Sequence, residues 1–152
     1  MFTITKRLAD WNEAAIDPAL TLGQKYVEES SGSRYMYVKF VDSAFADGAG
    51  CVWSTAAGAV TKSGTTEANV NLLAGICIGA KTQNYYGWIL TDGFYDEVLV
   101  IGAAVAIGDE LGFHTTAGQF MEVTAVRGGR IIAQEAGAAA VSNIRCHVRC
   151  GG

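Results

Sequence analysis

The feature that most constrains the fold of this chain is an internal repeat. Residues 40–60 align with residues 100–120, and the same large aromatic position recurs as Trp53 in the first copy and Phe113 in the second. Several further positions, including an Ala-Gly pair in each copy, match in the same register. A duplicated unit of about 60 residues predicts two similar substructures that pack around one core.

Short strand patterns separated by glycine turns run through most of the sequence. Residues 34–41 are rich in aromatic and β-branched side chains and alternate in the way that a half-buried strand does. Further strands, separated by turn pairs such as Asp92-Gly93, are expected at 87–90, 97–101, 120–124, 129–133 and 144–148. Such a series is typical of antiparallel sandwiches and barrels. We therefore predict an all-β fold, a compact antiparallel β-barrel or sandwich made of two related halves, at about residues 34–90 and 96–148.

The first 24 residues differ from the rest of the chain. Their apolar residues follow no sustained period, and Asp17-Pro18 favours an extended joint because proline excludes the helical conformation from the residue before it. We expect residues 1–24 to form an N-terminal arm that lies on the chain's own body or on a neighbour, and residues 25–152 to form the β-domain. A frayed terminus is the alternative, although a disordered tail would carry fewer large apolar residues.

The composition of the chain limits the classes of partner that it is expected to bind and the compartments in which it is expected to be made. The 152 residues are 50% hydrophobic and carry a net charge of −4 without a basic run, so nucleic-acid binding is not expected. No apolar stretch reaches the roughly 18 residues of a membrane span. The N-terminus lacks the apolar core of a secretory leader, so synthesis in a cytoplasm is expected. The four cysteines, which we therefore expect to be free thiols, are Cys51, Cys77, Cys146 and Cys150.

Few side chains are suited to catalysis. The only histidines are His114 and His147, and no nucleophile elbow or phosphate-binding loop is present. Cys146 and Cys150 flank His147, but in an extended strand they would lie about 13 Å apart, too far for a disulfide or a shared zinc ion. We therefore expect no enzymatic activity, no metal and no cofactor.

Several short motifs of small residues and strand edges occur in a fixed order, at residues 17–18, 22–23, 32–39, 46–48, 73–80, 107–111 and 116–118. Their order resembles that in the head decoration, or cement, proteins of tailed bacteriophages. Members of that family are β-rich and non-catalytic, bind the outside of the expanded capsid, often as trimers, and stabilise it. The resemblance implies a structural virion protein on the outer capsid surface, with the major capsid protein as partner and self-association as a homotrimer.

The same resemblance suggests contact residues. Because an N-terminal arm commonly reaches over the shell or a neighbouring subunit in that family, it implies contacts at Trp11, Ile16, Leu20 and Leu22. The adjacent Tyr85 and Tyr86 stand in a polar loop and are further candidates, since tyrosine offers rigid amphipathic area for an interface. The alternative for this pair is that one ring covers an edge of the core.

Two other functions remain open at this point. A phage tail or fibre-attachment subunit would also suit a duplicated β-unit. A carbohydrate-binding β-module would use Trp53, Trp88 and Tyr85 as a sugar-binding face, which requires at least two coplanar rings open to water. Equivalent core positions for Trp53 and Phe113 would argue against it.

Overall fold

The regular secondary structure of the described residues is almost all β-strand, and strands make up 51% of the structure. A computed structural model describes residues 7–62, 73–101, 105–114, 116–122, 130–138 and 140–150. In these residues it forms η1 (Leu8–Asp10), β1 (Lys25–Val27), β2 (Arg34–Phe40), β3 (Gly50–Trp53), β4 (Ala59–Lys62), β5 (Leu73–Cys77), β6 (Tyr85–Val100), β7 (Leu111–Phe113), β8 (Phe120–Glu122), β9 (Ile131–Ala133) and β10 (Ser142–Arg149). The predicted all-β fold is confirmed. In the described part of the chain, no helix has the length and apolar character needed to cross a membrane.

The first repeat closes into a five-stranded barrel. The strands follow the order β2, β4, β3, β5 and β6, and pairing of β6 with β2 closes the ring. Side chains of alternate strand positions fill the interior, because successive residues of a strand point to opposite faces. The buried interior is formed by Met36, Val38, Phe40, Phe45, Ala49, Cys51, Val60, Ala74, Cys77 and Ile89.

The second repeat follows the same strand order. β8 runs parallel to the end of β6 through Val100 and Phe120, just as β4 runs parallel to the end of β2 through Phe40 and Val60. β7 pairs with β8, β9 pairs with β10, and β10 returns to β6. Residues 102–104 and 115 of the aligned copies lie outside the described residues, as do positions 123, 124 and 129 of the predicted strands.

Backbone hydrogen bonds repeat with the strands. The N–H of Gly48 donates to the carbonyl of Cys77 over 2.9 Å, and the N–H of Gly108 donates to the carbonyl of Ala133 over 2.8 Å. The isolated bridge between Phe45 and Lys81 recurs as the bridge between Val105 and Gly137. The two related halves expected from the sequence therefore repeat one strand order. The first half closes as a five-stranded barrel, whereas in the second half, called the second barrel below, an isolated bridge between Glu110 and Ile132 links the β7 and β9 regions.

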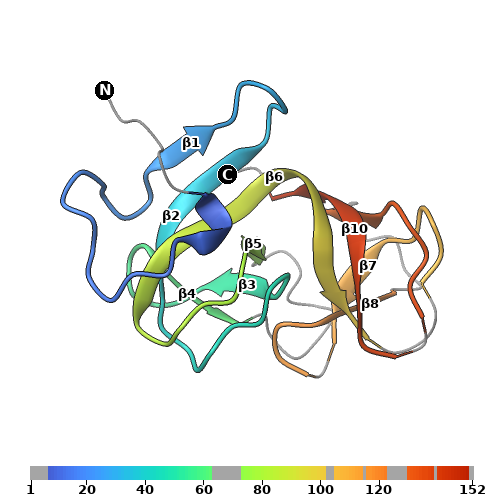
Figure 1. The fold of residues 1–152 in the computed structure, drawn as a ribbon. Helices are drawn as coiled ribbons and strands as arrows, with labels where there is room; N and C mark the ends of the chain where they lie inside the picture. The colour runs from blue at the N-terminus through green and yellow to red at the C-terminus, as the bar shows by residue number, and fades with distance from the viewer. Residues whose placement is uncertain are drawn as a thin grey trace.

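The two barrels share a strand. β6 is 16 residues long; its first half closes the first barrel and its second half pairs with β8 and β10. In Figure 1 it arches from the group of β2 to β5 over to the group of β7, β8 and β10. The predicted break at Asp92-Gly93 is wrong, because Gly93 (φ 135°) lies within β6, where the missing side chain leaves room for Ser33.

An aromatic layer covers the outside of the first barrel. Trp11, just after η1, packs edge-on against Tyr37 of β2 and Trp88 of β6, with ring centroids 6.5 and 6.1 Å apart. Tyr26 of β1 meets the same Trp88 ring at 6.3 Å. The first barrel therefore has an inner core and a second apolar layer, which the N-terminal segment and β1 close from outside.

Gly48 and its counterpart Gly108 give a matched stability test. Both have left-handed backbones (φ 81° and 91°), but a Cβ at Gly48 would strike the backbone carbonyl of Glu97, whereas a Cβ at Gly108 would meet open space. Gly108→Ala is expected to lower the free energy of unfolding by about 1–2 kcal/mol. Gly48→Ala adds a backbone clash and should cost about 3–5 kcal/mol. Urea unfolding measures both, and equal losses would contradict the close approach of Gly48 to β6.

Candidate functional site

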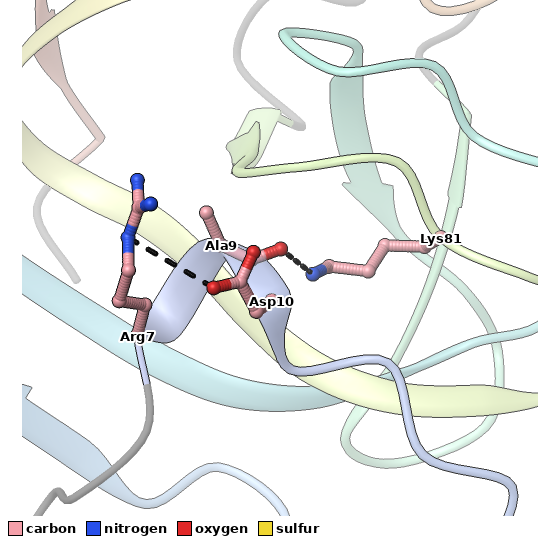
Figure 2. Close-up of polar contacts among 4 residues, drawn as sticks. All are labelled: Arg7, Ala9, Asp10 and Lys81. Atoms are coloured by element: carbon pink, nitrogen blue, oxygen red, sulfur yellow. Dashed lines mark hydrogen bonds and ion pairs between the residues drawn. The ribbon is translucent and has the colours of Figure 1, made fainter.

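A buried lysine fastens the N-terminal segment to the first barrel. Lys81 is only 2% exposed, and its Nζ donates hydrogen bonds to the carbonyl oxygens of Trp11 (2.7 Å) and Ala9 (3.2 Å). Figure 2 shows this ammonium reaching the end of η1, where Arg7 and Asp10 form an exposed ion pair at 3.9 Å. The last carbonyls of a helix have no partner within the helix, so the ammonium supplies the donors that they need.

The backbone of this segment also lies directly on the barrel. A Cβ at Gly79 would strike the carbonyl of Ala9, and a Cβ at Gly87 would strike that of Trp11. Glu13 bridges Tyr86 through two backbone hydrogen bonds of 2.8 and 3.1 Å. Of the arm predicted at residues 1–24, the described part therefore lies on the chain's own body.

The predicted arm contacts divide into buried and exposed side chains. Trp11 (6% exposed) and Leu20 (4%) belong to the chain's own core, so their side chains are already used within the chain. Leu22 is half-buried and contacts the β3–β4 turn at Gly58. Ile16 is 43% exposed and is the one of these four that presents substantial apolar surface to the outside.

The predicted tyrosine pair begins β6, and both side chains are half-buried. Tyr86 stacks on Tyr37 with ring centroids 6.3 Å apart, and the ammonium of Lys39 lies 5.7 Å from its centroid. Tyr86 therefore fits the alternative stated for this pair, in which one ring covers an edge of the core.

An open pocket lies beside η1. It has a volume of about 350 Å³ and is lined by Arg7, Leu8, Ala9, Tyr26, Glu28, Tyr35, Ile78 and Tyr95. The hydroxyl of Tyr95 donates to Oδ1 of Asp47 over 2.5 Å, and the N–H of Gly79 donates to the same oxygen over 2.9 Å. The polar end of Tyr95 thus joins β6 to two loops of the first barrel.

The groups considered for metal or acid–base chemistry lie apart. His147 stacks on Phe94, and Nδ1 of His114 accepts a hydrogen bond from the N–H of Thr116 over 3.0 Å. Among the described residues, no three His, Cys, Asp or Glu side chains gather closely enough to hold a metal ion. All four cysteines are free thiols, and burial raises the pKa of Cys146 and of Cys150 to about 12.

Large apolar side chains are instead scattered over the outer surface. Those described with exposures between 43% and 71% are Ile16, Val27, Trp53, Phe94, Ile107 and Val141. Sequence reasoning did not single out Val27, Phe94, Ile107 or Val141. The repeat could have indicated that Ile107 is exposed, because it aligns with the acidic Asp47 of the first copy.

The two copies use their shared aromatic position differently. Phe113 is 1% exposed and packs on Phe120 at 5.8 Å, whereas Trp53 is 45% exposed. Trp88 is fully buried, so it does not join Trp53 in a sugar-binding platform. Equivalent strand positions thus carry a core ring in one barrel and a surface ring in the other.

Comparison with known proteins adds no relative. No protein-family model matches the chain, and no curated protein sequence matches it significantly.

Lys81→Met tests how the N-terminal segment is held. The methionine cannot donate to the carbonyls of Ala9 and Trp11, and hydrogen bonds to charged groups contribute about 1.5–3 kcal/mol each, so we expect a loss of about 2–4 kcal/mol in unfolding free energy. Amide hydrogen exchange should accelerate most at residues 9–13. Lys62→Met is the control, since Lys62 donates to Ser43 at the surface. If amide hydrogen exchange at residues 9–13 is unchanged in Lys81→Met, the Lys81 hydrogen bonds do not hold the N-terminal segment in place.

The environment of Tyr95 predicts that the free energy of unfolding depends on pH in the alkaline range. Burial and the Asp47 carboxylate raise the pKa of Tyr95 above the usual value of 10.0. A pKa raised by folding stabilises the fold below pH 10, and this contribution is lost as the pH rises further, by at most about 1.4 kcal/mol per pH unit for one proton. The stability difference between wild type and Tyr95→Phe should therefore shrink above pH 10 in urea unfolding. Tyr85→Phe is the control; parallel profiles for wild type and Tyr95→Phe would contradict the assignment.

Proposed function

We propose that this protein is a structural virion protein that binds the outer surface of a phage capsid through the major capsid protein and stabilises the expanded shell. The motif order that resembles the decoration proteins supports this proposal. Two of those motifs, residues 46–48 and 107–111, occupy corresponding turns of the two barrels.

The observation that carries the proposal is the exposure of Trp53. Its counterpart Phe113 shows that the repeat can bury a large ring at this position, yet Trp53 remains 45% exposed. Exposed apolar area costs roughly 25 cal/mol per Å² relative to burial, and tryptophan is enriched among the residues that dominate protein interfaces. A water-exposed tryptophan on a strand of a rigid barrel is suited to docking on another protein.

The architecture suits a cementing role. A shell presents many identical sites, so modest contacts by a multivalent binder add up to high avidity. A strand that belongs to both barrels transmits load between them through covalent bonds and β-ladders rather than through a flexible linker. This supports a protein that holds neighbouring shell subunits together.

Self-association as a homotrimer is part of the proposal. β1 stands at one end of the strand order, and its Val27 is 51% exposed. Edge strands leave unpaired backbone groups that proteins cover or pair, and closed symmetric assembly is one way to do so. A trimer would also raise the avidity of each docking surface.

A tail or fibre-attachment subunit is the alternative that shares these surfaces. It differs only in the particle to which the chain binds. A sugar-binding module is less well supported, because Trp88 is buried and Tyr85 is half-buried.

The proposal predicts binding of the purified protein to expanded, undecorated heads of its phage. Native mass spectrometry should show a trimer, and decorated heads should withstand higher temperature than undecorated heads. Trp53→Ser is expected to weaken head binding about tenfold or more, as removal of a central interface tryptophan does. Val141→Ser, at a residue 55% exposed, is the control and should bind normally. A protein that ignores heads but binds tails would replace the proposal with the alternative.

A further inference from the structure

The open pocket beside η1 has no part in the function proposed above. Its volume of about 350 Å³ lies within the range of about 300–1,000 Å³ that is usual for ligand pockets. Its walls come from the N-terminal segment, β1, β2 and β6, which are far apart in the sequence and which the fold brings together. The pocket is therefore a product of the folded chain and not a feature of one loop.

Three tyrosine rings form part of the pocket wall. Tyr26, Tyr35 and Tyr95 are all half-buried, so each keeps part of its surface accessible. Tyr26 stacks on Tyr35 with ring centroids 6.2 Å apart and meets Trp88 edge-on at 6.3 Å. The hydroxyl of Tyr95 is held by its hydrogen bond to Asp47. Because these contacts fix the rings, a ligand that binds against them loses little free energy to the ordering of side chains.

The charges at the pocket do not balance. Arg7 and Glu28 both line it, but Arg7 already pairs with Asp10 at 3.9 Å (Figure 2). Oε1 of Glu28 accepts hydrogen bonds from the hydroxyls of Ser30 and Ser31 over 3.1 and 2.9 Å, and Glu28 forms no ion pair with any described residue. Neutral hydroxyls do not cancel the charge of a carboxylate, so the pocket keeps a net negative charge.

Two of the tyrosines respond to this negative charge. Burial and the charge of Glu28 raise the pKa of Tyr35 above its usual value. Burial and the Asp47 carboxylate do the same to the pKa of Tyr95. A nearby carboxylate opposes the ionisation of a phenol because it opposes a second negative charge, and for the same reason it attracts a cation.

Aromatic rings beside a carboxylate favour an organic cation over other ligands. The face of a tyrosine ring carries partial negative charge and attracts a lysine or arginine side chain within about 6 Å. The chain makes such a contact elsewhere, since Nζ of Lys39 lies 5.7 Å from the ring centroid of Tyr86. An anion would be repelled by Glu28 and would find Arg7 already paired, and an apolar ligand would cover the Glu28 carboxylate without giving it a partner.

We propose that this pocket, with Tyr26, Glu28, Tyr35 and Tyr95 as its recognition groups, binds the side chain of a lysine or arginine of the major capsid protein. Because the pocket is open to the surface, a basic side chain enters it while the rest of the partner stays outside. The inference rests on the proposed function and adds to it a contact that selects for positive charge.

A titration with a small cation tests the chemistry of the pocket without heads. Tetramethylammonium should bind in the millimolar range and shift the NMR signals of the Tyr26, Tyr35 and Tyr95 rings, whereas tert-butanol, a neutral molecule of similar shape, should not. Glu28→Gln should weaken this binding about two- to fivefold, and its amide oxygen can still accept from the serine hydroxyls. Glu29→Gln is the matched control, since Glu29 is the adjacent, exposed carboxylate and does not line the pocket. Equal binding of the two probes, or no loss in Glu28→Gln, overturns the proposal.

Binding to expanded, undecorated heads then tests the source of the cation. Glu28→Gln should bind heads about tenfold more weakly than wild type or Glu29→Gln, because a multivalent binder multiplies the loss at each site. If wild type and Glu28→Gln bind heads equally well although the pocket takes up tetramethylammonium, the capsid side chain is the wrong occupant and the site serves a free organic cation. Wild type that takes up tetramethylammonium but ignores heads refutes the proposed function, and with it the capsid protein as the source, while the cation site itself stands.

Discussion

The pairing of β6 with β2 on one barrel and with β10 on the other is the interaction on which the structure depends. One 16-residue strand closes the first barrel through β2 and pairs with β8 and β10 of the second, so both halves depend on it. Asp47 reinforces this junction, since its carboxylate accepts from Tyr95 on β6 and from Gly79. The duplication therefore yields one continuous body, and surfaces on the two barrels are held at a fixed spacing.

The two copies keep their backbone pattern and diverge in side chains. Lys81, which clamps the N-terminal segment, has Gly137 as its bridge counterpart, and this glycine has no side chain with which to hold a segment. Cys77 pairs with Ile89 and Ala133 pairs with Cys146, so the buried Trp88, which precedes Ile89, corresponds to the exposed Arg145. Backbone N–H and C=O groups can pair between strands whichever non-proline side chains they carry, so outward-facing positions of the two halves can differ without a change of strand order.

Much of the fold was predictable from local patterns, whereas the surfaces were not. The repeat and the alternation in residues 34–41 predict the strands and the two related halves, because both follow from side-chain period and turn chemistry. Asp92-Gly93 misleads, since a glycine that makes room for Ser33 has the same sequence signature as one that makes a turn. The burial of Trp11 and the exposure of Phe94 depend on which segment covers which barrel, and no local pattern encodes that.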